Sequence, residues 1–130
     1  MSKLKVTTIA NVADSESTDV TNVINGSAKA WVNFNGTGTV AIRRAFNVSS
    51  ITDNSTGNYT VNFTTAMADA NYAAVCSAHY QDSVSLYIGL TSTRLLSTGS
   101  LRFVAGPEST ATGQWVASDY STLCVAIFSN

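Results

Sequence analysis

Residues 30–67 read AWVNFNGTGTVAIRRAFNVSSITDNSTGNYTVNFTTAM, and apolar and polar residues alternate along most of this stretch. A period of two is that of a strand with one buried face. In residues 40–48, one row of alternate positions holds Val40, Ile42, Arg44, Phe46 and Val48. In residues 59–63, the same period is carried by Tyr59, Val61 and Phe63. We therefore expect a β-strand in each segment.

Turn-forming residues separate the expected strands. Residues 53–58, DNSTGN, tolerate positive φ or hydrogen-bond their own backbone. The strands at 40–48 and 59–63 are therefore expected to close as an antiparallel hairpin across this loop. Residues 35–38, NGTG, are a second turn signal. It follows a short strand that carries two aromatic residues, Trp31 and Phe34. Together these elements predict a β-meander.

Further short strands follow the meander. We expect them at 71–78, 84–90, 101–104, 115–117 and 123–128. The last, LCVAIF, is almost continuously apolar, which is typical of a central strand. Residues 91–100 and 105–113 read as polar connections. Seven to nine short strands without an internal repeat predict an all-β domain over 28–130, an antiparallel, jelly-roll-like β-sandwich.

Residues 1–27 differ from the rest and are expected to form a short arm or helical turn. Residues 3–12 alternate weakly, and residues 13–19 are polar and acidic. A single helix face then follows at the i, i+3 and i+4 positions, Val20, Val23 and Ile24. Ser17 or Thr18 could cap this helix and Gly26 could end it. So short a helix must pack on something, either its own domain or another protein to which the arm attaches.

Composition favours a chain that packs against neutral polar surfaces. The 130 residues suit one domain. Charged residues make up 12%, against a usual share of about 25%, while 17 Ser, 17 Thr and 11 Asn supply most of the polarity. Such a surface loses little free energy when it meets another neutral polar surface. Copies of the chain itself, or carbohydrate, are the partners that this composition suggests.

Charge and cysteine usage exclude several classes of partner. Seven Lys and Arg balance eight Asp and Glu, without a basic run, so we expect no nucleic-acid binding. No apolar stretch approaches the ~20 residues of a membrane span, and the amino terminus lacks the apolar core of a signal peptide. Cys76 and Cys124 are expected to be small buried residues of strands rather than a disulfide. No pattern in the chain indicates a cofactor.

The segments AWVNFNGTGTVAIR and FNVSSITDNSTGNYTVNFTTAM resemble a family of short bacteriophage virion proteins, described as tail-fibre or other phage structural proteins. The resemblance covers residues 28–67, and the opening MSKLKVTTIANV is similar to the start of the same proteins. It implies a place in the virion and a homotrimer. It further implies attachment to other virion proteins, for which we expect residues 1–27 to be used.

An enzymatic function finds little support. The only histidine, His79, is followed by Asp82, which could orient an imidazole. No nucleophile elbow, metal-ligand cluster or phosphate-binding glycine loop accompanies it. Glycan hydrolysis would need a carboxylate pair, and the candidate acids are scattered over predicted loops, Asp53, Asp69, Asp82, Glu108 and Asp119. We expect no catalytic residues.

Receptor or carbohydrate binding is more plausible, because sugars stack on aromatic rings while amides and carboxylates bond their hydroxyls. Two loop clusters have this composition, Tyr80, Gln81 and Asp82, and Gln114, Trp115, Asp119 and Tyr120. The alternative is that Trp115 lies in the core and Tyr120 on a sheet edge.

Arg44 interrupts the otherwise apolar row of residues 40–48, and Arg43 precedes it on the opposite row. Neighbouring strand residues face opposite sides, so only one of them is readily exposed if the other side is packed. Arginines are common at subunit boundaries, where partners can satisfy them. Arg43, Arg44 and Phe46 are therefore candidate interface residues.

These features together predict a non-enzymatic phage virion component, a trimeric tail-fibre or tail-tip adhesin that binds the host surface. A capsid decoration or head-fibre protein and a lectin-like carbohydrate-binding module are the alternatives.

Overall fold

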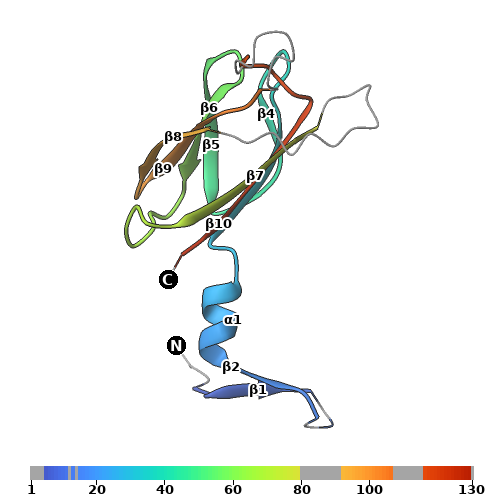
Figure 1. Ribbon diagram of the computed structural model, residues 1–130, viewed down its shortest axis with the longest axis vertical. Coiled ribbons are helices and arrows are strands. Elements are labelled where there is room, and N and C mark those ends of the chain that lie inside the picture. The colour runs from blue at the N-terminus through green and yellow to red at the C-terminus, as the bar shows by residue number, and fades with distance from the viewer. Residues whose placement is uncertain (1–4, 12, 14, 80–91, 107–115, 130) are drawn as a thin grey trace.

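The structure, a computed structural model, describes residues 5–11, 13, 15–79, 92–106 and 116–129. Two antiparallel sheets pack against each other, and a hairpin and a helix extend from one end (Figure 1). The elements are β1 (Thr8–Ala10), β2 (Ser17–Asp19), α1 (Val20–Gly26), β3 (Ala30–Asn35), β4 (Ala41–Phe46), β5 (Val48–Ser55), β6 (Asn58–Phe63), β7 (Ala73–His79), β8 (Ser92–Ser97), β9 (Ser100–Val104) and β10 (Thr122–Phe128). The predicted antiparallel β-sandwich is confirmed.

Within the described ranges, each sheet of the sandwich contains four strands. The first sheet has the order β4-β3-β10-β7, and the second has the order β5-β6-β9-β8. Eight strands in two sheets is also the strand number of a jelly roll. β10 pairs with β3 on one side and β7 on the other, so the final strand is central, as its apolar sequence predicted.

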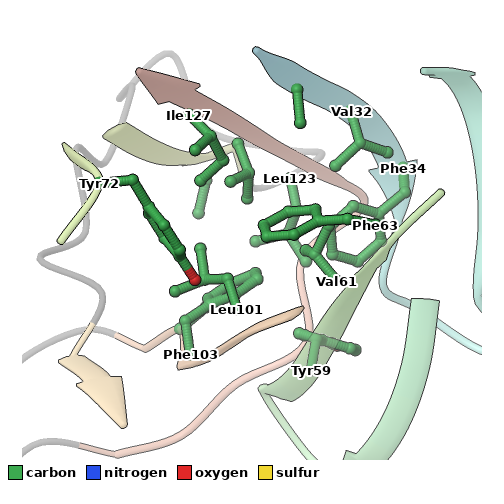
Figure 2. Packing of buried hydrophobic residues seen from close by; sticks show 14 of the residues in the cluster. Val32, Phe34, Tyr59, Val61, Phe63, Tyr72, Leu101, Phe103, Leu123 and Ile127 are labelled. Carbon is green, nitrogen blue, oxygen red and sulfur yellow. The ribbon is translucent and has the colours of Figure 1, made fainter. Parts of the chain in front are cut away.

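The core lies between the two sheets and is built from alternate residues of β3, β6, β9 and β10, which are buried while their neighbours are half-buried or exposed. Phe34, Tyr59 and Phe103 form an aromatic cluster with ring centroids 5.3, 5.9 and 6.3 Å apart. Figure 2 shows side chains from both sheets meeting in this space. The period of two therefore identified the buried face of β6 correctly.

The predicted hairpin between 40–48 and 59–63 is wrong. The segment 40–48 is not one strand: β4 ends at Phe46, the chain turns at Asn47, and β5 begins at Val48 in the other sheet. β6 pairs with β5, and the turn between them is confined to Thr56 and Gly57. Half of the predicted loop, residues 53–55, continues β5 instead.

Asn47 makes the corner between the sheets. Its φ of 54° lies in the left-handed region, which asparagine tolerates better than most residues. Its side-chain amide donates to the carbonyls of Lys29 (3.0 Å) and Thr65 (3.1 Å), and its Oδ1 accepts from the Thr65 amide (2.7 Å). Alternation of side chains cannot reveal a corner of this kind, because the pattern continues across it.

Two other strand predictions differ from the structure. β8 forms at 92–97, where a polar connection was expected, because its pairing with β9 supplies the backbone hydrogen bonds. Val116 and Ala117 do not form a strand. The predicted strand at 84–90 lies outside the described residues, as does Trp115.

The arm consists of the β1–β2 hairpin followed by α1. Asp19 caps the helix, in place of the predicted Ser17 or Thr18, and its carboxylate accepts from the Thr21 amide at 2.7 Å. That hydrogen bond lowers the pKa of Asp19. No residue of β1, β2 or α1 is buried, and the arm projects away from the sandwich (Figure 1). Across the described ranges, no helix is long and apolar enough to cross a membrane.

Candidate functional site

The distal end of the sandwich, opposite the arm, is where the predicted receptor loops begin and end. The chain leaves the described structure at His79, which pairs with Thr122 at the start of β10, and returns at Ser92, which pairs with Val104 at the end of β9. Five of the predicted contact residues lie outside the described residues, Tyr80, Gln81, Asp82, Gln114 and Trp115. Their role stays a prediction.

Asp119 holds the distal end together. Its Oδ1 accepts a hydrogen bond from the Gly57 amide at 2.7 Å and from the Tyr59 hydroxyl at 2.6 Å. The same hydroxyl lies 2.9 Å from the Gly36 carbonyl oxygen. Burial raises the pKa of Tyr59, and the neighbouring Asp119 carboxylate raises it further. This carboxylate, predicted as a ligand contact, thus joins the segment before β10 to residues 57–59 of its own chain.

Tyr120 is not available as a receptor contact. Only 2% of its surface is exposed, and it belongs to the core rather than to a sheet edge. Its carbonyl accepts from the Gly36 amide at 2.9 Å, so the segment before β10 folds over the end of the sandwich. An aromatic residue in a polar sequence resembles a loop contact, but here the large apolar ring is buried.

The titratable side chains that the structure describes form no metal-binding cluster. Within the part of the chain that the structure describes, no three His, Cys, Asp or Glu residues lie where they could hold a metal ion. His79 ends β7, and its carbonyl accepts from the Ser121 hydroxyl at 3.3 Å. Cys76 is opposite the buried Val125, whereas Cys124 is opposite Ser77 on the other face. The two cysteines therefore project to opposite sides of the first sheet, and no disulfide joins them.

A β-bulge explains how both arginines of β4 are exposed. The register between β3 and β4 shifts between Asn33 and Phe34, which places Arg43 in the irregular position beside Arg44. Arg43 donates to Asn33 and Thr122 side chains and to the Ser121 carbonyl. The simple alternation that put the two arginines on opposite faces is wrong, because it assumed a regular strand.

The outer face of the first sheet carries an apolar row that spans all four strands. Phe46 is opposite Trp31, Trp31 is opposite Ala126, and Ala126 is opposite Val75. The larger side chains are far from buried, with 54% of Phe46, 39% of Trp31 and 60% of Val75 exposed. A hollow of about 290 Å³ lies between Trp31 and Val75, with Cys124 and Ala126 among its lining residues.

Sequence reasoning found Phe46 but missed Trp31 and Val75. Both belong to short strands in which residues on both faces are apolar, AWVNF and NYAAVCSA. That pattern was the available signal, since a sheet face exposed to water normally carries polar residues.

Over β5 and β6, the outer face of the second sheet is polar and internally hydrogen-bonded. Asn62 donates to the hydroxyls of Ser50 (3.0 Å) and Thr52 (2.9 Å), and Asn54 donates to Thr60 (2.9 Å). These side chains therefore hydrogen-bond one another between the two strands. Among the described residues, the two outer faces of the sandwich therefore differ, and the apolar row across all strands lies on the first sheet.

The arm presents a second apolar surface. Of the predicted attachment residues, Val20 is half-buried, while Val23 and Ile24 are exposed. Val6 and Ile9 are exposed as well. The described residues therefore show no packing of the helix on its own sandwich, and attachment to another protein stays a prediction.

Comparison of the chain with protein-family models, with curated proteins and with solved structures gives no significant match.

Proposed function

We propose that this protein is a structural component of a bacteriophage virion, a trimeric tail-fibre or tail-tip module that contacts the host cell surface. The observation that carries the proposal is the arm. It leaves one end of the sandwich, buries none of its residues in β1, β2 and α1, and exposes Val6, Ile9, Val23 and Ile24 to water. Burying apolar side chains lowers the free energy, whereas leaving them in water does not. Exposed apolar residues of this kind therefore indicate a surface that another molecule covers.

The opposite end of the sandwich supports a recognition role. The segments that hold Tyr80, Gln81, Asp82, Gln114 and Trp115 both start and finish there. A rigid sandwich that presents connections at one end is a common way to build a binding surface. An anchor at one end and predicted contact segments that start and finish at the other suit a fibre module, in agreement with the resemblance of residues 28–67 to phage virion proteins.

Solution mass tests the assembly. Light scattering after gel filtration should give a trimer for the full chain. A chain that begins at Ser27 retains every core residue, because the core begins at Ala30. If this shorter chain is also a trimer, the sandwich itself provides an interface; if it is a monomer, the arm is the assembly device. Monomers in both cases would contradict the fibre proposal.

Competition with infection tests the host contact. Purified full chain should bind host cells and reduce adsorption of the phage that encodes it. A variant with Tyr80, Gln81 and Trp115 replaced by alanine should lose both effects while keeping its circular dichroism spectrum. Unchanged competition by that variant would place the contact elsewhere on the protein.

A capsid decoration or head-fibre protein is the second candidate, because the same exposed arm could equally attach to a shell. Such a protein should bind purified capsids and leave adsorption unchanged. A lectin-like module would instead bind isolated host glycans as a single subunit.

We propose no catalytic activity. If His79→Ala or Asp82→Ala abolished turnover of a host polysaccharide by the purified protein, this part of the proposal would fail.

A further inference from the structure

We infer that the apolar row of the first sheet, Phe46, Trp31, Ala126 and Val75, is the surface on which copies of this chain pack against one another. The inference rests on the proposed trimer and identifies the part of the sandwich that forms its interface. It concerns the outer face of β4-β3-β10-β7, not the hydrogen-bonded outer face of the second sheet.

Shape favours a second copy as the occupant. Phe46 projects from β4, at one edge of the sheet, and 54% of it is exposed. The hollow of about 290 Å³ lies toward the opposite edge, between Trp31 and Val75, and the small residue Ala126 is among those that line it. A protrusion and a hollow on the same face are complementary between copies. Three copies with their first sheets toward a common axis would bring the β4 edge of each to the β7 edge of the next, which closes a ring.

The available area indicates that the interface includes the arm. An aromatic side chain has about 150–250 Å² of surface, so the exposed parts of Trp31, Phe46 and Val75 amount to a few hundred Å². A stable interface needs roughly 800 Å² from each partner. The exposed apolar residues of the arm, Ile9 and Ile24 among them, supply further area.

The apolar row and the exposed apolar residues of the arm lie next to each other, which favours a second copy of the chain as the partner. Trp31 is the second residue of β3, which follows α1 after only residues 27–29, so the apolar row lies at the end of the sheet nearest the arm. A copy aligned in parallel places arm beside arm and row beside row at the same time. Any other partner would have to match both surfaces independently.

Charge is distributed as in a subunit boundary. Arg44 lies opposite Asn33, one row farther from the arm than Phe46 and Trp31. The arginine therefore borders the apolar row instead of interrupting it. Apolar centres with polar and charged rims are characteristic of protein interfaces, so Arg43 and Arg44 fit the rim.

Two matched substitutions in the full chain test the inference. Val75 on the outer face of the first sheet and Leu95 on that of the second are each 60% exposed. Val75→Lys should raise the concentration at which the trimer dissociates at least tenfold in sedimentation velocity, because it places three like charges in the interface. Leu95→Lys should leave that concentration unchanged. Phe46→Ser, at an exposed edge position, should weaken the trimer in the same direction and serves if Val75→Lys does not fold.

The outcomes separate this inference from the proposed function. Suppose that the wild type is a trimer and that Val75→Lys and Phe46→Ser both fold, as judged by circular dichroism. If both variants then dissociate at the same concentration as the wild type, the apolar row is not the interface. The virion proposal would then still stand on the arm. Equal weakening by Leu95→Lys would also overturn the assignment to the first sheet. A monomeric wild type would remove both the trimer and its interface.

Discussion

At the scale of single residues, Asp119 shows how a predicted ligand contact becomes a structural group. Its carboxylate accepts from the Gly57 amide and the Tyr59 hydroxyl, 2.7 and 2.6 Å away. Hydrogen bonds to a charged acceptor are the stronger ones. They join the β5–β6 turn to the segment before β10, two parts of the chain about sixty residues apart.

Asp119→Ala should lower the free energy of unfolding by about 2 kcal/mol, because it removes both bonds to a half-exposed charged acceptor. Asp119→Asn should cost about half as much, since its oxygen can still accept. Urea unfolding measures both, with the neighbouring Ser118→Ala as a control. A loss from Asp119→Ala no larger than that of the control would show that the carboxylate contributes little to stability.

The raised pKa of Tyr59 predicts that the fold loses stability at high pH. Burial and Asp119 raise this pKa above its ordinary value of about 10. The folded state therefore holds the phenolic proton more tightly than the unfolded state does. This difference in proton affinity contributes to the free energy of unfolding. The contribution is fully present below pH ~10 and is lost as the pH rises above it.

The free energy of unfolding of the wild type should thus fall as the pH increases beyond about 10. That of the Tyr59→Phe variant should fall less steeply. Burial also raises the pKa of Tyr72, so some slope should remain. Urea titrations at a series of pH values give both slopes. Equal slopes for wild type and Tyr59→Phe would contradict the assignment.

Two substitutions of Asn47, at the corner between the sheets, distinguish the cost of its positive φ from the loss of its side-chain hydrogen bonds. Asn47→Ala loses three hydrogen bonds and must also hold a positive φ, which costs a residue with a Cβ roughly 1–2 kcal/mol. Asn47→Gly loses the same bonds without that strain. We expect alanine to be the more destabilising in thermal unfolding. The reverse order would mean that the backbone conformation carries no cost here.

At the scale of elements, the turn between β3 and β4 depends on close packing at Gly36. A Cβ there would lie 2.7 Å from both the Leu123 Cδ1 atom and the Tyr59 hydroxyl. Gly36→Ala should therefore destabilise the fold by about 2 kcal/mol, as overpacking usually does. Gly99, between β8 and β9, has no atom within 4 Å of an added Cβ. The free energy of unfolding of Gly99→Ala should stay within about 0.5 kcal/mol of that of the wild type. Chemical unfolding measures both variants. Equal losses for Gly36→Ala and Gly99→Ala would contradict the packing argument.

At the scale of the whole molecule, the arm and the sandwich are nearly independent. No residue of β1, β2 or α1 is buried, whereas the core draws on residues from Ala30 onward. Diluted until both are monomeric, the full chain and the chain beginning at Ser27 should unfold within about 0.5 kcal/mol of each other. A loss of several kcal/mol on truncation would mean that the arm packs on its own domain in solution.

The sequence by itself determined the class of fold. Alternation of period two located the buried residues of β6, and the apolar run at 123–128 identified the central strand. Low charge together with many hydroxyl and amide groups is equally a property of the sequence, and the neutral partners that it suggests stay a prediction. These properties are local or additive along the chain, so the order of residues suffices to recognise them.

Only the tertiary structure decided which strands are neighbours and what each face does. Asn47 divides a continuous alternation between two sheets, and a bulge brings Arg43 beside Arg44. Trp31 and Val75 form one row although they lie 44 positions apart in the chain, because β10 pairs between their strands. Contacts of this kind depend on register between distant segments, and register is set by the packing of the whole sandwich, not by any one stretch of sequence.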